Sequence, residues 1–198
     1  MNWKHLFLAG VLALLSSFLF GCAKDEVKPP EPTSSAKEPA PPQPPIVVLM
    51  EVEKKGKVFL ELYPEKAPET VKHILKLIDE GFYNGQHIHR VEDWVVQWGD
   101  PLSKDMKGNE GRVGSGGSGT QLPFEDNDIK MEKGTLAMAS TGAKVGGDCQ
   151  MFILTNVSPE QVTTFLQGNY SAFGKVIAGQ DVVDKLAIGD AIKMMRAK

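Results

Sequence analysis

Glycines in the middle of the chain have a spacing that could support phosphate binding. Gly114, Gly116 and Gly119 formally match the G-x-G-x-x-G pattern of dinucleotide-binding proteins. That function requires a strand before the glycines and an amphipathic helix after them. Here Pro123 follows almost at once, and no helical period of apolar residues is present. We therefore interpret this segment as a flexible loop and not as a nucleotide site.

Two histidines and a cysteine are the other candidates for chemistry. His87 and His89 lie two residues apart, so on a strand both face the same side and could bind a metal. No third ligand stands at a suggestive spacing in the sequence, so we expect strand packing or exposure and no metal. Asp148 precedes Cys149 and raises the pKa of a neighbouring thiol, which argues against a cysteine nucleophile.

A set of short blocks is far more specific than these motifs. In residues 89–101 an arginine, an aromatic residue and a glutamine follow one another, as Arg90, Trp94 and Gln97. The other blocks are Leu62-Tyr63-Pro64, Ala67–Val71, Gly81-Phe82-Tyr83, Gly134–Ala139, Gln150–Ile153 and Phe165–Val176. These blocks, in this order, resemble the cyclophilins, and the resemblance covers about Lys57 to Val176.

The resemblance implies both a fold and an activity. The fold is mainly β, a closed eight-stranded antiparallel barrel capped by two α-helices. The activity is peptidyl-prolyl cis/trans isomerisation, with Arg90 matching the catalytic arginine of the family. The residues that match the substrate-binding pocket are Trp94, Val95, Gln97, Ala139, Gln150, Phe152, Phe165, Leu166 and Tyr170.

Physical chemistry explains these residue types. Rotation about an X–Pro bond meets a barrier of about 20 kcal/mol, because the twisted amide loses its resonance. The proline nitrogen regains a lone pair in the twisted state, so a guanidinium that donates to it stabilises the transition state selectively. An apolar pocket holds the ring and excludes water. No cofactor or metal is needed, and we expect none.

The sequence departs from the family pattern around the arginine. Trp94 follows Arg90 by four residues where the family usually has five, and Trp98 replaces a usual glycine. A compensating bulge would restore the register. We expect Trp98 to crowd the backbone, and we expect the departures as a group to lie at the rim of the pocket. These departures leave open a non-catalytic peptide-binding or chaperone module, or an assembly partner in an envelope complex. Retention of Arg90 and Phe152 favours the isomerase.

The elements that must position these residues follow from the pattern of apolar residues. Strand-like runs at Ile46–Glu53 and Lys57–Tyr63 predict a hairpin. A helix begins at Pro68, carries apolar residues at helical spacing and ends at Gly81. The remaining predictions are strands at Gln86–Val91, Trp94–Gly99, Thr135–Ala139, Met151–Leu154, Phe173–Ile177 and Ile192–Met195, and a helix at Asp181–Ile188.

Residues 1–21 predict a lipoprotein signal peptide. Lys4 precedes Leu6–Phe20, fifteen residues without charge, which is short for a bilayer span. The run ends at Gly21-Cys22 and resembles a bacterial lipobox, which implies that Cys22 receives lipid and anchors the chain to a membrane. Ala23 and Lys24 favour the periplasmic face of an outer membrane. Ordinary secretion and an uncleaved anchor are the alternatives.

Composition separates the remaining chain into a tether and a domain. Eight of the thirteen prolines lie between Pro29 and Pro45, so residues 22–45 predict a disordered tether. Residues 46–198 form one domain, and the 41% apolar content allows a packed core. A net charge of −3 argues against nucleic-acid binding. We expect a monomer in the cell envelope that acts on proline-containing, unfolded or partly folded exported proteins.

Overall fold

The computed structural model describes residues 43–198. The predicted signal peptide, the lipidated Cys22 and most of the predicted tether therefore lie outside the described residues. Within residues 43–198, no helix has both the length and the apolar character that crossing a bilayer requires.

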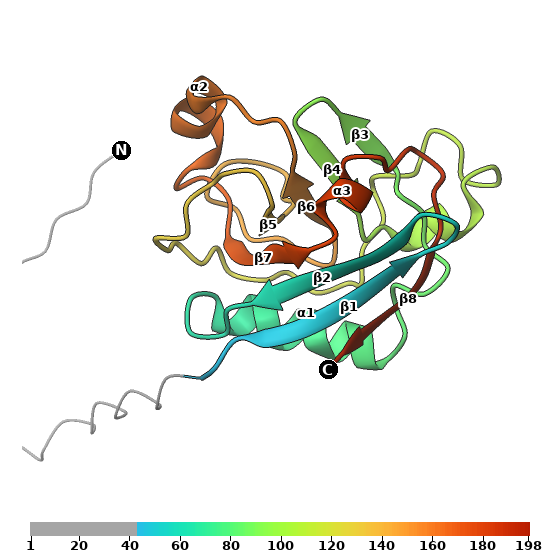
Figure 1. Ribbon diagram of the computed structural model, residues 1–198, viewed down its shortest axis with the longest axis horizontal. Coiled ribbons are helices and arrows are strands. Elements are labelled where there is room, and N and C mark those ends of the chain that lie inside the picture. The colour runs from blue at the N-terminus through green and yellow to red at the C-terminus, as the bar shows by residue number, and fades with distance from the viewer. Residues whose placement is uncertain (1–42) are drawn as a thin grey trace, which may run out of the picture. The chain divides into compact units, whose positions relative to one another are not determined.

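Eight antiparallel strands form one strongly curled sheet (Figure 1). Their order across the sheet is β3-β4-β6-β5-β7-β2-β1-β8. The strands are β1 (Ile46–Val52), β2 (Gly56–Leu62), β3 (Arg90–Glu92), β4 (Val95–Trp98), β5 (Thr135–Met138), β6 (Met151–Leu154), β7 (Ala172–Ala178) and β8 (Ile192–Ala197). The mainly β, eight-stranded antiparallel fold expected from the sequence is confirmed.

The sheet is open, so the expected closed barrel is wrong in that respect. The edge strands β3 and β8 do not pair with each other along their length. The chain just before β3 meets the start of β8 through one bridge, His87↔Ala191, and through the bond from Ile88 N–H to the Asp190 carbonyl, 2.9 Å long. β3 itself has only three residues and does not pair with β8, so the sheet stays open between them.

One long helix covers the sheet, and the other helices are short. The long helix α1 (Pro68–Asp79) starts with proline and Glu69, which suit a helix N-terminus. Its buried face carries Val71, Ile74 and Ile78, and it lies alongside β8 and β1 (Figure 1). The short helices are η1 (Pro101–Asp105), α2 (Pro159–Gln161), η2 (Val162–Leu166) and α3 (Gln180–Val183).

The short helices differ from the prediction. The helix expected at Asp181–Ile188 is only the four residues of α3. The helical stretch from α2 into η2 was not predicted, although its sequence carries a capping box. The Ser158 hydroxyl accepts a hydrogen bond from the Gln161 N–H, and the Gln161 side chain accepts one from the Ser158 N–H.

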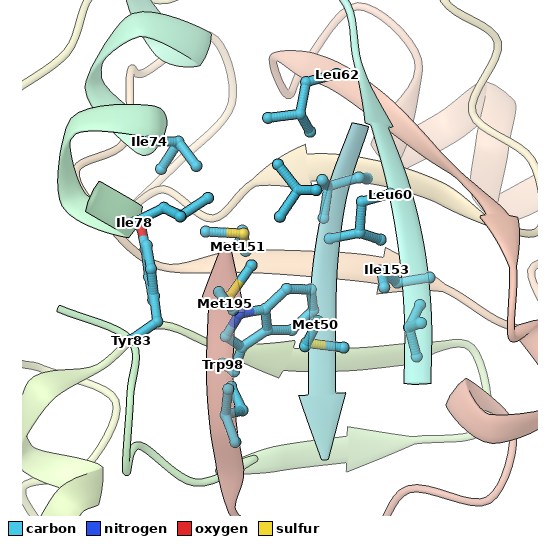
Figure 2. Close-up of a cluster of buried hydrophobic side chains, with 14 of the residues drawn as sticks. Met50, Leu60, Leu62, Ile74, Ile78, Tyr83, Trp98, Met151, Ile153 and Met195 are labelled. Atoms are coloured by element: carbon cyan, nitrogen blue, oxygen red, sulfur yellow. The ribbon is translucent and has the colours of Figure 1, made fainter. Parts of the chain in front are cut away.

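Side chains alternate along the strands between two hydrophobic clusters. The main cluster fills the inside of the curled sheet and includes Met50, Ile74 and Met195 (Figure 2). The second cluster contains Val95, Ile129, Met131, Ala137, Phe152, Leu154, Leu166 and Ala172. On β4, Val96 belongs to the main cluster and Val95 to the second one. Successive side chains point to opposite faces of a strand, which produces this division.

The alternation also corrects the expectation for Trp98. This side chain is fully buried in the main cluster, among Met50 and Met195 (Figure 2). It therefore lies on the other face of β4 from Gln97 and is not part of the pocket rim, where we expected the departures from the family pattern to lie.

Candidate active site

The β3–β4 hairpin sets the position of the arginine. Arg90 pairs with Gln97 and Glu92 pairs with Val95, so only Asp93 and Trp94 form the connecting turn. The pairing continues without a register shift, and the expected compensating bulge is absent from this described hairpin. The tight two-residue turn accommodates the short spacing between Arg90 and Trp94.

Contacts within the hairpin fix the Arg90 side chain. Its Nε donates to Glu92 Oε1 at 2.7 Å, and its Nη1 donates to Gln97 Oε1 at 3.0 Å. The guanidinium carbon lies 5.4 Å from the centre of the Trp94 ring. Within residues 43–198 no hydrogen bond engages the remaining nitrogen, Nη2. The arginine is thus oriented by its neighbours and keeps donors for a ligand.

Glu92 is a site residue that the sequence analysis missed. One carboxylate oxygen accepts from Arg90, and the other accepts from Trp94 Nε1 at 2.9 Å. The hydrogen bond and the charge of Arg90 lower the pKa of Glu92. The signal was the two-residue spacing from Arg90, which places both side chains on one face of β3.

Two amides extend this polar network away from the arginine. Gln97 Nε2 donates to Gln150 Oε1 at 3.0 Å. Gln150 Nε2 donates in turn to the carbonyl oxygens of Gly114, at 3.0 Å, and Gly116, at 2.8 Å. The glycine carbonyl groups thus orient the Gln150 amide, Gln150 orients the Gln97 amide, and Gln97 holds Arg90.

A buried carboxylate organises that glycine loop. Asp100 is completely buried and accepts hydrogen bonds from the N–H groups of Leu102, Gly114 and Gly116. A Cβ atom at Gly116 would collide with the Asp100 side chain, so this close approach requires glycine. The segment that we interpreted as a flexible loop is thus bound to a fixed anchor, which its composition did not reveal.

A cavity of about 140 Å³, with both polar and apolar side chains in its walls, lies beside Arg90. Phe152 and Tyr170 meet edge to face there, with ring centres 5.5 Å apart. Both belong to the second cluster or pack against it, so that cluster forms the floor of the cavity. The lining residues are Arg90, Trp94, Val95, Gln97, Ala139, Ser140, Phe152, Leu166 and Tyr170.

The structure brings together most of the residues that the sequence nominated. Phe165 is the exception, because its side chain is 64% exposed and does not line the cavity. The helical turn of η2 directs the neighbouring Leu166 inward, at 2% exposure, and leaves Phe165 outside. Gln150 does not line the cavity either, but it accepts a hydrogen bond from Gln97, which does. Ser140 lines the cavity and was missed.

Comparison with known proteins decides the family. The family described as "Cyclophilin type peptidyl-prolyl cis-trans isomerase/CLD" matches residues 47–197. The chain belongs to the cyclophilins.

The curated relatives are named as peptidyl-prolyl cis-trans isomerases. This cyclophilin is 41% identical over 140 residues to a "Probable peptidyl-prolyl cis-trans isomerase" of Brucella suis, covering 69% of each chain. It is 36% identical over 146 residues to "Peptidyl-prolyl cis-trans isomerase B" of Bacillus subtilis, covering 72% of this chain and 92% of that one.

A solved structure of a Cryptosporidium parvum cyclophilin type isomerase, crystallised in the presence of the dipeptide Ala-Pro, is also similar. The TM-score is 0.62 and the identity 25%, over 77% of this chain and 98% of that chain.

The other candidate chemistry in this cyclophilin has structural explanations. Burial and the neighbouring Asp148 raise the pKa of the Cys149 thiol to about 12, so the thiol is not a ready nucleophile. His87 Nδ1 lies 2.6 Å from the Ser103 carbonyl oxygen. Among residues 43–198, no three His, Cys, Asp or Glu side chains are grouped to hold a metal.

We expect His89 to make the stability of this cyclophilin depend on pH. Burial lowers its pKa, although the charge of Asp100 acts in the opposite direction. An unfolded histidine titrates near pH 6.5. Below about that pH the unfolded state binds more protons than the folded state, so the free energy of unfolding falls as the pH falls.

Urea unfolding at a series of pH values measures this effect. His89→Gln removes the titrating group, so the loss of stability on acidification below about pH 6.5 should become shallower than in wild type. Parallel curves for the two proteins would show that His89 does not contribute.

Proposed function

We propose that this cyclophilin accelerates cis–trans rotation about X–Pro bonds in unfolded or partly folded exported proteins, with Arg90 as the catalytic residue. The observation that carries the proposal is the oriented Arg90 side chain, with Nη2 donors unused by residues 43–198, at the edge of a cavity with an apolar floor. This is the arrangement that a twisting prolyl amide requires.

The first step is capture of the proline ring. The cavity floor of Val95, Phe152 and Leu166 is apolar and almost inaccessible to water. A pyrrolidine ring that enters it gains the free energy of apolar burial and holds the proline side of the bond still. The preceding residue remains free to turn about the C–N bond.

The second step is stabilisation of the twisted amide. As the amide rotates, its nitrogen loses resonance with the carbonyl group and becomes a hydrogen-bond acceptor. The planar guanidinium of Arg90 offers a rigid set of donors. Glu92 and Gln97 hold the guanidinium before substrate arrives, so little reorganisation is needed at the transition state. No covalent bond forms, and no proton is transferred.

The N-terminal sequence supports a location at a membrane for the domain and its substrates. A signal peptide that ends at Cys22, followed by a proline-rich tether, would hold the domain at a membrane where exported chains emerge. If this anchor is correct, Cys22→Ala will move the protein from the membrane fraction to the soluble fraction of the envelope. An unchanged membrane fraction would show that Cys22 is not required to hold the protein at the membrane.

An assay without a coupling protease tests the activity. We would add the intact chain, purified in a mild detergent, to a short peptide with one X–Pro bond and follow cis–trans exchange by NMR. Catalytic amounts should broaden and exchange the cis and trans resonances far faster than the uncatalysed process, which takes tens of seconds or longer.

The competing function is a non-catalytic peptide-binding or chaperone module. That module would produce saturable shifts of the peptide resonances without faster exchange. Such a result from a folded protein would overturn the isomerase mechanism proposed for Arg90.

A further inference from the structure

A second cavity of about 430 Å³ adjoins the prolyl cavity. The two cavities share Gln97, Ala139 and Ser140 in their walls. A peptide whose proline ring occupies the first cavity can therefore place a neighbouring side chain in the second. Glycines line much of this second cavity, at positions 114, 116, 146 and 147, which leaves room for a long side chain.

Asp148 gives the second cavity its charge. It is the one charged side chain among the lining residues, which are otherwise glycine, alanine and neutral polar residues. The Asp148 carboxylate accepts hydrogen bonds from the Ser118 N–H at 2.7 Å, from the Gly119 N–H at 3.1 Å and from the Ser118 hydroxyl. These bonds fix the carboxylate at the wall, while 25% of the side chain stays accessible.

The basic group beside this carboxylate is His73 of α1. Its Nε2 lies 3.7 Å from Asp148 Oδ1 and 3.3 Å from the Ser118 hydroxyl. His73 is not among the residues that line the cavity, and only 11% of its own side chain is exposed, so it does not fill the cavity side of the carboxylate. A fixed, recessed charge attracts a cation more effectively than a mobile charge on an open surface.

We propose that this second cavity is a subsite for a lysine or arginine side chain next to the X–Pro bond, with Asp148 as the specificity-determining residue. The inference rests on the proposed function, because it assumes that a peptide reaches both cavities together. It defines the preferred substrates as proline-containing segments with a cationic residue near the proline.

The test compares three matched peptides that differ at one position near proline, with Lys, Gln or Glu there. The position is scanned on both sides of the X–Pro bond. At low salt, wild type should favour Lys over Glu by about 5-fold or more in kcat/KM, with Gln between them. Added salt should reduce this ratio.

Variants separate charge from structure. Asp148→Asn keeps an acceptor for the loop and removes the charge, so it should bring the kcat/KM values of the three peptides close together. Asp181→Asn removes the same charge from an exposed side chain of α3 and should leave the ratio unchanged. His73→Gln should preserve the Lys preference.

The outcomes distinguish this inference from the function on which it rests. Equal rates for Lys, Gln and Glu in an active enzyme, or a preference that survives Asp148→Asn, would overturn the acidic subsite and leave the isomerase intact. If no peptide is turned over, the isomerase mechanism fails. The dissociation constants of the same peptides then test the subsite independently, by the same order and the same loss in Asp148→Asn.

Discussion

Replacing Arg90 with alanine should lower kcat/KM for an X–Pro peptide by about 10–100-fold, the equivalent of one charge-assisted hydrogen bond in the transition state. Peptide affinity should change much less, because the apolar floor of the cavity is untouched. Exchange NMR gives the rate, and titration of the same peptide gives the dissociation constant. A variant with wild-type kcat/KM would remove Arg90 from the mechanism.

Arg90→Lys provides a sharper comparison than alanine alone. Lysine keeps the charge but cannot donate to Glu92, Gln97 and a substrate from one planar group. We therefore expect it to behave more like alanine than like wild type. Arg196→Ala on β8 is the matched control, since it removes an exposed arginine from a strand at the other edge of the sheet. It should retain full activity.

Gly99→Ala should strongly destabilise the fold next to the site. Gly99 has φ of +107°, and an added Cβ would lie 2.6 Å from the Gln150 Cα and closer still to the Cys149 carbonyl oxygen. Both are backbone atoms, so β4 and β6 must separate. Backbone strain of about 1–2 kcal/mol and overpacking of about 1–3 kcal/mol together predict a loss of about 2–5 kcal/mol in the free energy of unfolding.

Gly85→Ala is the control that isolates the strain. Gly85 has φ of +76°, but a Cβ there meets no atom of the described chain within 4 Å. Urea unfolding of the two variants should show a cost of about 1–2 kcal/mol for Gly85→Ala and the larger loss for Gly99→Ala. Equal losses would mean that the close packing of β4 on β6 relaxes freely. Movement of Gln150 should also lower the activity of the Gly99 variant.

Local patterns could predict most of the strands, because strand alternation and helical spacing are encoded by nearby residues. The chain from β1 through α1 matches the prediction closely, since Pro68 and the apolar face of α1 give clear signals. The state of the sheet edge could not be predicted in this way. It depends on whether the antiparallel pairing near His87 and Ala191, over a hundred positions apart, continues along the strands or stops.

In the site, too, residues in recognisable sequence blocks could be predicted, whereas roles that depend on contacts between distant residues could not. The order of blocks nominated Arg90, Gln97 and Phe152, and the structure places all three around one cavity. The expected position of Trp98 at the pocket rim was wrong because it ignored the alternation of side chains along β4. Asp100 was missed because its role depends on backbone N–H groups of a loop that returns from fourteen and sixteen residues further along the chain.

The separation of the two hydrophobic clusters has an evolutionary consequence. The cavity floor draws on the second cluster, whereas the inside of the curled sheet holds the main one. Mutations at Phe152, Leu166 or Tyr170 therefore act on ligand preference first and leave the main core in place. Descendants of such a domain can evolve a new ligand preference through substitutions in the second cluster, while the main cluster still holds the fold together.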